Sequence, residues 1–165
     1  MIALRAALAS LATIIVAGSA PPLQAQDNSA CAAFEVYPDY VDVRLVDLGE
    51  PGMSIGDMRV GEVRLLDDTG AEVGRQHFQA TVIPGGGDGV HMLVGHGDEV
   101  YANGTITWSG SFTIADPSTQ GPPADDVVVS VIGGTGDFAG ANGTLTWSND
   151  AQGRRVASFD ISCVQ

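Results

Sequence analysis

The sequence contains no lysine, and its seven basic residues are all arginine. Twenty acidic residues oppose them, so the net charge of the 165-residue chain is −13 at pH 7. Such a chain repels polyanions, and we therefore expect neither nucleic acid nor an anionic membrane surface as a partner. Charged residues make up 16% of the chain and hydrophobic residues 44%, which predicts a folded core rather than a disordered chain.

Helical periodicity is scarce after the first 25 residues, whereas alternation of apolar and polar residues is common. In the segment 102–114 the apolar residues Ile106, Trp108 and Phe112 alternate with threonine and serine. Strong turn signals rich in Gly, Pro, Asn and Asp separate such runs, for example at residues 67–70, 84–89 and 149–153. The pattern predicts strands near residues 36–48, 58–66, 71–83, 90–100, 104–114, 127–132, 143–148 and 154–164.

Two segments echo one another: ANGTITWS at residues 102–109 recurs as ANGTLTWS at residues 141–148. Two copies are too few for a propeller or solenoid, so we expect two equivalent strands with the same side chains facing inward. The predicted fold class is all-β, an eight-stranded antiparallel closed β-barrel, with a two-sheet β-sandwich as the alternative. A barrel of this size leaves an interior for side chains or one small ligand.

The beginning of the chain is typical of a secretory signal. Arg5 precedes an apolar stretch at residues 6–18, and Ala25 offers a small residue for cleavage. The stretch is shorter than the ~20 apolar residues that a membrane-spanning helix needs. We therefore predict a signal peptide at residues 1–25, one barrel domain at residues 26–165, a secreted or periplasmic location, and no membrane association after cleavage.

The chain has only two cysteines, Cys31 and Cys163, which lie near the two ends of the expected domain. In an oxidising compartment such a pair indicates a disulfide, and an even number of strands in a closed barrel would bring the two together. Two unpaired buried thiols are the alternative. No metal site is predicted, because the three histidines lack ligand spacing and neither cysteine has a suitable neighbour.

Other motifs carry little chemistry. Residues 134–139 fit GxGxxA, but the following residues alternate like a strand, whereas a nucleotide-binding turn must open a helix. No GxSxG nucleophile elbow is present, so a hydrolase triad is unsupported.

The stretch VIGGTGDFAGANGTLTW at residues 131–147 resembles the glycine-rich signature of the allene oxide cyclase and dirigent barrels. The spacing of Phe138, Gly140 and Gly143 is closer to the cyclase branch. A second block, Gly56 and Asp57 followed by VRLLDDTG, is similar to the same families. The resemblance covers roughly residues 36–164.

This resemblance implies a calycin-like barrel that binds a small hydrophobic molecule and works without a cofactor. Plant allene oxide cyclases close a ring on an unstable fatty-acid epoxide by confining its conformation, and dirigent proteins steer the coupling of phenoxy radicals. Related bacterial barrels cyclise polyketides. The resemblance also implies self-association as dimers or trimers.

The functional residues of these families carry over poorly. Glu35 matches the acidic residue on the first strand of the cyclases. The position of their water-holding asparagine falls at Val63, and that of their pocket cysteine falls near Ala80. The dirigent arginine that follows the glycine-rich block is missing from residues 138–141.

Two functional hypotheses follow, with a third as a variant. The first is an exported, cofactor-free cyclase or isomerase, with Glu35, Arg44 and His77 as polar or catalytic groups. The second is a non-catalytic carrier of a hydrophobic molecule. The third is a solid structural barrel that packs the threonine- and serine-rich face of residues 104–114 on a partner subunit. The expected ligand-binding walls are Phe78, Trp108, Phe112, Trp147 and Phe159.

Overall fold

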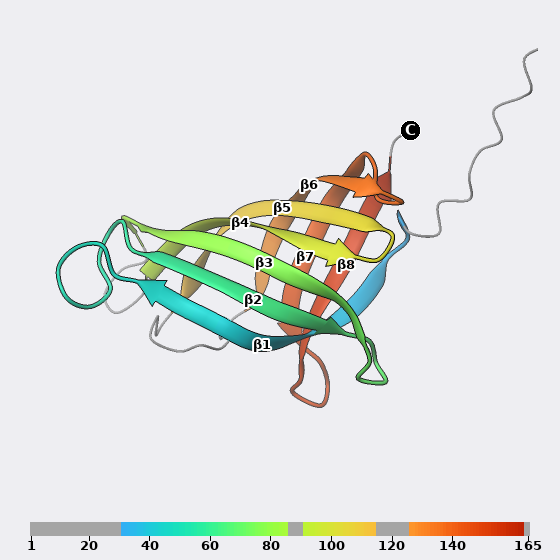
Figure 1. Ribbon diagram of the computed structural model, residues 1–165, viewed down its shortest axis with the longest axis horizontal. Coiled ribbons are helices and arrows are strands. Elements are labelled where there is room, and N and C mark those ends of the chain that lie inside the picture. Colours follow the sequence, from blue (N-terminus) through green and yellow to red (C-terminus); the bar gives the residue numbers. More distant parts are fainter. Residues whose placement is uncertain (1–30, 86–90, 115–125, 164–165) are drawn as a thin grey trace, which may run out of the picture.

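The computed structural model describes residues 31–85, 91–114 and 126–163. Within these ranges eight antiparallel strands follow one another round a closed barrel, in which β8 pairs with β1 (Figure 1). The strands are β1 (Phe34–Val46), β2 (Met58–Leu66), β3 (Glu72–Ile83), β4 (His91–Tyr101), β5 (Gly104–Ile114), β6 (Val127–Gly136), β7 (Ala141–Asn149) and β8 (Arg155–Cys163). The predicted closed barrel is confirmed, and the sandwich alternative is wrong.

Parts of the sequence-based prediction fall outside the described residues. They include the signal expected at residues 1–25 and most of the turn expected at residues 84–89. In the part of the chain that is described, no helix is long and apolar enough to cross a membrane.

Alternation along the strands builds the barrel core. Leu145 and Trp147 of β7 and Phe159 of β8 are all nearly inaccessible to water. Their intervening neighbours, such as Thr144 and Asp160, are exposed. Successive strand residues point to opposite faces, so the apolar set lies inside and the hydroxyl-rich set outside.

Two hairpin turns have the same construction. Asp67 accepts hydrogen bonds at Oδ1 from the backbone N–H groups of Thr69 and Ala71, each at 2.9 Å. Asp150 does the same for Gln152 and Arg154, at 2.9 and 2.8 Å. These Asp-x-x-Gly turns lie where the sequence predicted them, because an aspartate at the first turn position can replace a backbone acceptor.

The sixth strand is longer than expected. It was predicted to end at residue 132, but β6 continues to Gly136 and pairs there with Gly104 of β5. The glycines of this segment let two backbones approach closely: a Cβ on Gly134 would lie 2.6 Å from the carbonyl oxygen of Thr105. The glycine-rich signature is therefore mainly strand, and the turn follows it at residues 137–140.

The seam between β1 and β8 is the shortest pairing in the barrel. Only three residue pairs join these strands, from Phe34 with Phe159 to Val36 with Ala157. Pro38 follows two residues later, and proline has no N–H to donate to a ladder. The pairing therefore stops where the sequence removes a donor.

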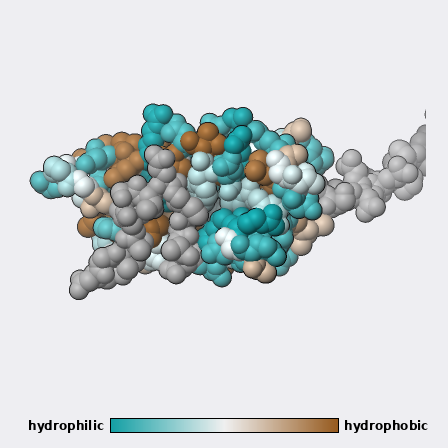
Figure 2. All heavy atoms as spheres, turned by 90° about the horizontal axis from the view of Figure 1, so that it is seen from below, coloured by the Kyte–Doolittle hydropathy of each residue, from teal (hydrophilic) through white to brown (hydrophobic). Residues whose placement is uncertain are grey.

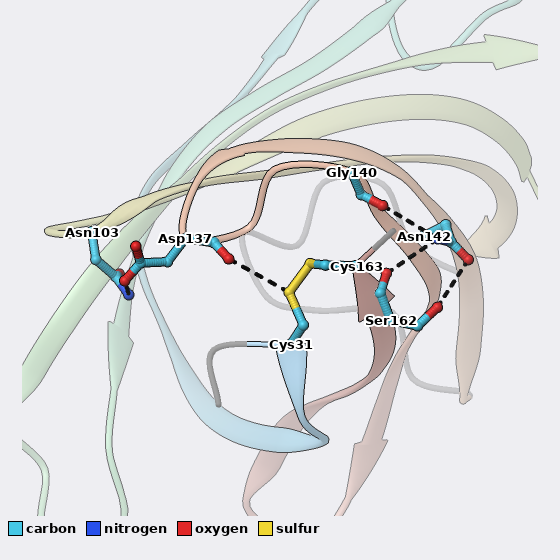
Figure 3. The surroundings of a disulfide bond; sticks show 7 residues. All are labelled: Cys31, Asn103, Asp137, Gly140, Asn142, Ser162 and Cys163. Carbon is cyan, nitrogen blue, oxygen red and sulfur yellow. Dashed lines mark hydrogen bonds between the residues drawn. A yellow bond between two sulfur atoms is a disulfide. The ribbon is translucent and has the colours of Figure 1, made fainter. Parts of the chain in front are cut away.

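A disulfide closes the same seam at its end. Cys31 and Cys163 are bonded, with their Cα atoms 5.7 Å apart, although 132 positions separate them in the chain. Figure 3 shows the bond beside the turn that follows β6, where Cys31 Sγ lies 3.6 Å from the carbonyl oxygen of Asp137. The predicted pairing of the two cysteines is confirmed.

The other end of the barrel is splayed. In the described residues the β5–β6 register runs only from Gly104 to Ser109 of β5, so the second half of β5 continues past β6. The second half of β1 likewise continues past its pairing with β8. Strands β1 to β5 therefore project beyond β6 to β8 and present an inner face there (Figure 1).

Candidate functional site

A pocket opens on the inner face of the barrel where the long strands face β6 and β7. Four aromatic side chains and one valine form its apolar walls, and a tyrosine, an arginine and a glutamine add polar groups. The lining residues are Tyr40, Arg59, Gln76, Phe78, Trp108, Phe112, Val127 and Trp147. The pocket combines apolar walls with a few convergent polar groups, the usual composition of a small-molecule site.

The pocket is narrow. Its space between atoms, including the open mouth, is about 360 Å³. The part of this space that water can occupy holds roughly two molecules. A larger ligand would have to move the aromatic walls apart.

Alternating glycines and aromatic rings set the width of the pocket. Gly61, Phe78, Gly97 and Trp108 are cross-strand neighbours on β2 to β5. A Cβ on Gly61 would lie 2.6 Å from the Phe78 ring, and one on Gly97 would lie 2.7 Å from the Trp108 ring. Each ring therefore leans over the glycine beside it, and any larger residue would push the rings into the pocket.

The two tryptophans of the sequence repeat meet inside the barrel. Trp108 of β5 and Trp147 of β7 form an edge-to-face pair, with ring centroids 4.9 Å apart and planes at 81°. This is a favoured geometry for two aromatic rings. The expected equivalence of the two repeated strands is confirmed, because both place a tryptophan in the core at the same position of the motif.

Arg59 brings a charge into this apolar setting. It is 3% exposed, and its guanidinium carbon lies 6.0 Å from the centre of the Phe78 ring. Burial lowers the pKa of Arg59, an effect that Tyr40 partly offsets. Burial also raises the pKa of Tyr40 to about 12, which the positive charges of Arg155 and Arg59 partly oppose. Tyr40 therefore keeps its hydroxyl proton at neutral pH.

Glu99 is the second buried ionisable group. It is fully buried on β4, directly opposite Gln76 of β3. Burial raises its pKa to about 8; the negative charge of Asp98 adds to this rise, and the Trp108 N–H opposes it. The Trp108 N–H is near the Glu99 carboxyl group but does not form a hydrogen bond with it. Neither carboxylate oxygen of Glu99 has a hydrogen-bond partner among the described residues. With a pKa of about 8, Glu99 is mainly protonated at neutral pH, and it lies beside the pocket without lining it.

The structure brings four of the five expected wall residues together. Phe78, Trp108, Phe112 and Trp147 all line the pocket. Phe159 does not: its ring stacks on Phe34, with centroids 4.5 Å apart, in the core near the disulfide. Strand alternation places Phe159 inside correctly, but alternation does not indicate at which height along the barrel a side chain lies.

The expected polar groups lie on the outer surface. Glu35 is exposed and accepts a hydrogen bond from Ser158 Oγ at 3.0 Å. Arg44 forms a salt bridge with Asp42 at 2.7 Å, and its side chain is 72% exposed. Arg44 and His77 share a shallow outer groove, and Glu35 lies in a separate one. None of the three faces the interior pocket.

Sequence reasoning missed the polar groups that do face inward. Gln76 is in phase with Phe78 and Ala80 along β3, and Arg59 is in phase with Val63 along β2. The signal was therefore present, because residues two apart in a strand share a face. Glu99 lies on the same face of β4 as Gly95 and Gly97. Because glycine has no side chain, these two residues do not form an apolar pattern that would identify this face as the buried one.

The fold and site together define a small closed antiparallel barrel with an aromatic-walled interior pocket. No family model matches the chain, and no curated protein matches its sequence. Solved structures do match its fold. Pyocyanin demethylase has a TM-score of 0.65 and 23% identity, covering 79% of this chain and 100% of that chain.

Two Diels–Alderases have the same fold. AbmU from Streptomyces koyangensis has a TM-score of 0.60 and 14% identity, covering 82% of this chain and 65% of that one. AbnU, an exo-specific intermolecular Diels–Alderase, has a TM-score of 0.56 and 13% identity, covering 77% of this chain and 95% of that one. At these identities the likeness establishes the barrel fold that this chain shares with them.

Proposed function

We propose that the barrel binds a small hydrophobic molecule in its interior pocket. The observation that carries this proposal is the presence of Arg59 and Gln76, each 3% exposed, in an aromatic-walled pocket. Removing a guanidinium and an amide from water costs free energy, and apolar residues of similar volume would stabilise a purely structural core as well or better. Apolar walls with a few convergent polar groups are the usual composition of a small-molecule site, in which the polar groups would orient the ligand.

The test uses the two tryptophans as reporters, since both line the pocket. Titration with 2-naphthoate or 2-naphthalenemethanol should shift both indole N–H signals in NMR spectra, with saturation. Val127→Phe should fill the pocket and weaken binding at least tenfold. Val128→Phe is the matched control, because Val128 is the next residue of β6 and is 59% exposed. Unchanged indole signals with both compounds would refute the proposal.

Catalysis is a second candidate, favoured by Glu99. A protonated carboxyl group in a dry interior is a group that enzymes use as a general acid. We propose on this basis a cofactor-independent cyclase or isomerase related to the allene oxide cyclase barrels. The fold is compatible, because solved neighbours include enzymes named as Diels–Alderases and a demethylase. Glu99 would reach a substrate only after the Trp108 ring moves. We expect a Glu99→Gln variant to bind the substrate without converting it.

Catalytic roles for Glu35, Arg44 and His77 stay a prediction. Their exposed positions would require chemistry on the outer surface. Alanine variants of all three should leave binding in the interior pocket unchanged, because none of them lines it.

We also propose that the chain is exported and that residues 1–25 are removed as a signal peptide. The leader pattern and the disulfide both support a secreted or periplasmic location, since disulfides persist in oxidising compartments. The mature chain would be the single domain at residues 26–165. Mass measurement of the protein from a secreting host tests the cleavage site after Ala25.

Self-association is proposed through the outer face of β5 to β7. These three strands contain no charged residue, although the chain has a net charge of −13. On the face that Figure 2 shows, apolar patches are separated by hydrophilic residues. Two copies would repel each other least across an uncharged face. Sedimentation of an Ile132→Glu variant should show loss of any dimer or trimer that the wild type forms.

A further inference from the structure

We infer that Glu99 is a pH-sensitive switch behind the interior pocket: once ionised, its carboxylate holds the Trp108 indole and weakens the binding of a neutral ligand. This inference rests on the proposed function and adds a regulation to that site. It follows from the position of Glu99 behind a pocket wall, from the unpartnered polar atoms around it, and from the cost of an ionised group in a buried position.

Trp108 forms part of the pocket wall and also lies against β4. It is the cross-strand neighbour of Gly97, and a Cβ on Gly97 would lie 2.8 Å from Cε2 of the indole, the carbon that is bonded to Nε1. Glu99 follows Gly97 by two residues, so it shares the inward face of β4. The N–H edge of the ring therefore lies beside the Glu99 carboxyl group, behind the wall that a ligand meets.

Polar atoms without partners gather at this place. Both carboxyl oxygens of Glu99 and the Nε1 of Trp108 are buried without a hydrogen-bond partner in the described part of the chain. Buried polar groups are nearly always paired, so such a group in a native structure needs an explanation. An ionised carboxylate accepts hydrogen bonds at both oxygens, whereas the protonated form has less acceptor capacity. Ionisation of Glu99 thus provides an acceptor for the unpartnered Trp108 N–H.

Ionisation of Glu99 opposes binding for two reasons. A charge-assisted hydrogen bond to the carboxylate holds the Trp108 ring, although a larger ligand must move the aromatic walls apart. A ligand in the pocket also displaces water from near Glu99, and desolvation penalises the charged form of a carboxyl group. The ligand therefore prefers the protonated form. Burial raises the pKa of Glu99 to about 8, so affinity is highest below this pH and falls as the pH rises through it.

The groups that face Glu99 keep their charge between pH 7 and pH 9. Its cross-strand neighbours, Gln76 on β3 and Ile106 on β5, are not ionisable. Burial, and then the negative charge of Glu99, raises the pKa of Tyr101 on β4. Burial also raises the pKa of Tyr40 on β1 to about 12. Both tyrosines therefore stay neutral over this range.

Three fixed charges complete these surroundings. Asp98 precedes Glu99 in the chain, lies on the outer face of β4 and adds negative charge. Arg59 and Arg155 act on Tyr40, and arginine keeps its proton over this range. A change in binding between pH 7 and pH 9 therefore reports on Glu99.

The first measurement uses the free protein. The indole nitrogen signal of Trp108, followed by NMR from pH 6 to pH 9, should move with a midpoint near 8 in the wild type and stay constant in Glu99→Gln. Trp147 is the internal control, because it also lines the pocket and its cross-strand neighbour on β8 is Ala157. A constant Trp108 signal, or equal movement of both signals, would overturn the inference and leave the proposed function intact.

The second measurement is calorimetric titration with 2-naphthalenemethanol, which has no charge over this range. A rise of one unit in the pKa of Glu99 on binding corresponds to about fivefold weaker binding at pH 9 than at pH 7. We expect a loss of this size in the wild type and none in Glu99→Gln. Glu72→Gln is the matched control, since it removes an exposed carboxylate from β3 and should keep the loss.

Equal affinity at both pH values in the wild type, or the same loss in Glu99→Gln, would overturn the inference while ligand binding stands. Absence of binding by 2-naphthalenemethanol would overturn it too, and if 2-naphthoate also fails to bind, the proposed function is wrong as well. Should Glu99→Gln fail to fold, the comparison of Trp108 with Trp147 in the wild type still decides.

Discussion

Individual residues decide where the aromatic rings of the barrel interior lie. Gly97 leaves no room for a side chain: a Cβ there would be 2.7 Å from both the Trp108 ring and the carbonyl oxygen of His77. The Trp108 ring occupies the space above this glycine, so even a single added methyl group at position 97 would change the shape of the pocket. Glycine is used here for close approach rather than for an unusual backbone angle.

Gly97→Ala should therefore destabilise the protein by about 1–3 kcal/mol, the usual cost of an added methyl group in a filled core. Gly133→Ala is the control, since a Cβ there has nothing within 4 Å. Urea unfolding of both variants measures the difference. Equal stabilities for the two would mean that Trp108 does not rest on this glycine.

Glu99 should make stability depend on pH in an unusual direction. In the folded state it holds its proton up to about pH 8, whereas in the unfolded chain it loses it near 4.5. The free energy of unfolding contributed by Glu99 is thus largest in acid and falls between these values, by at most about 1.4 kcal/mol per pH unit.

Glu99→Gln should remove this slope. Unfolding curves of wild type and variant at pH 5, 6, 7 and 8 should show the variant gaining stability relative to wild type as pH rises. Carboxylates such as Asp67 and Asp57, whose pKa values are lowered by hydrogen bonds, also make stability depend on pH in acid. Their contribution is the same in wild type and variant, so it cancels when the two are compared. A difference that is constant over this range would show that Glu99 is ionised when folded.

At the scale of elements, much of the fold follows from the sequence. Alternation identified eight strands, and β2 and β5 have the predicted bounds. The error at β6 arose because glycines signal turns, while here they allow close pairing with β5. The candidate site was harder to predict. Alternation shows which residues of a strand share a face, but it does not show which face points inward. A polar residue such as Arg59 is therefore assigned to the outer face unless the apolar residues two positions away are taken into account.

The seam between β1 and β8 is the shortest pairing among the described strands, and a disulfide joins its end. Three residue pairs join these strands, against ten between β3 and β4. Replacing Cys31 and Cys163 together by serine should lower the free energy of unfolding by about 2–5 kcal/mol. Reductant should destabilise the wild type and leave the double variant unchanged. Insensitivity of both to reductant would mean that the bond does not hold the seam.

Asp57 anchors the connection between β1 and β2. It is fully buried and accepts hydrogen bonds from the backbone N–H groups of Leu48 at 2.8 Å and Ser54 at 2.6 Å. Asp57→Ala would leave both donors without this acceptor and should cost about 1–3 kcal/mol. Asp47→Ala, which removes an exposed carboxylate from the same connection, should cost less. Thermal unfolding ranks the two.

On the scale of the whole molecule, the barrel separates an acidic outer surface from an interior without exposed carboxylates. Its outer surface carries most of the twenty acidic residues, while Arg59 and a protonated Glu99 lie inside. The sheet closes round this interior, and strands β1 to β5 project beyond the others at the splayed end (Figure 1).

The most direct test of the ligand-binding barrel is to locate a bound molecule. Intermolecular NOEs should connect the ring protons of 2-naphthoate with the side chains of Trp108, Trp147 and Phe112 in the wild-type protein. They should disappear in Val127→Phe and persist in Val128→Phe. NOEs to exposed apolar residues such as Leu48 and Ile55 instead, or the same NOEs in both variants, would contradict an interior binding site.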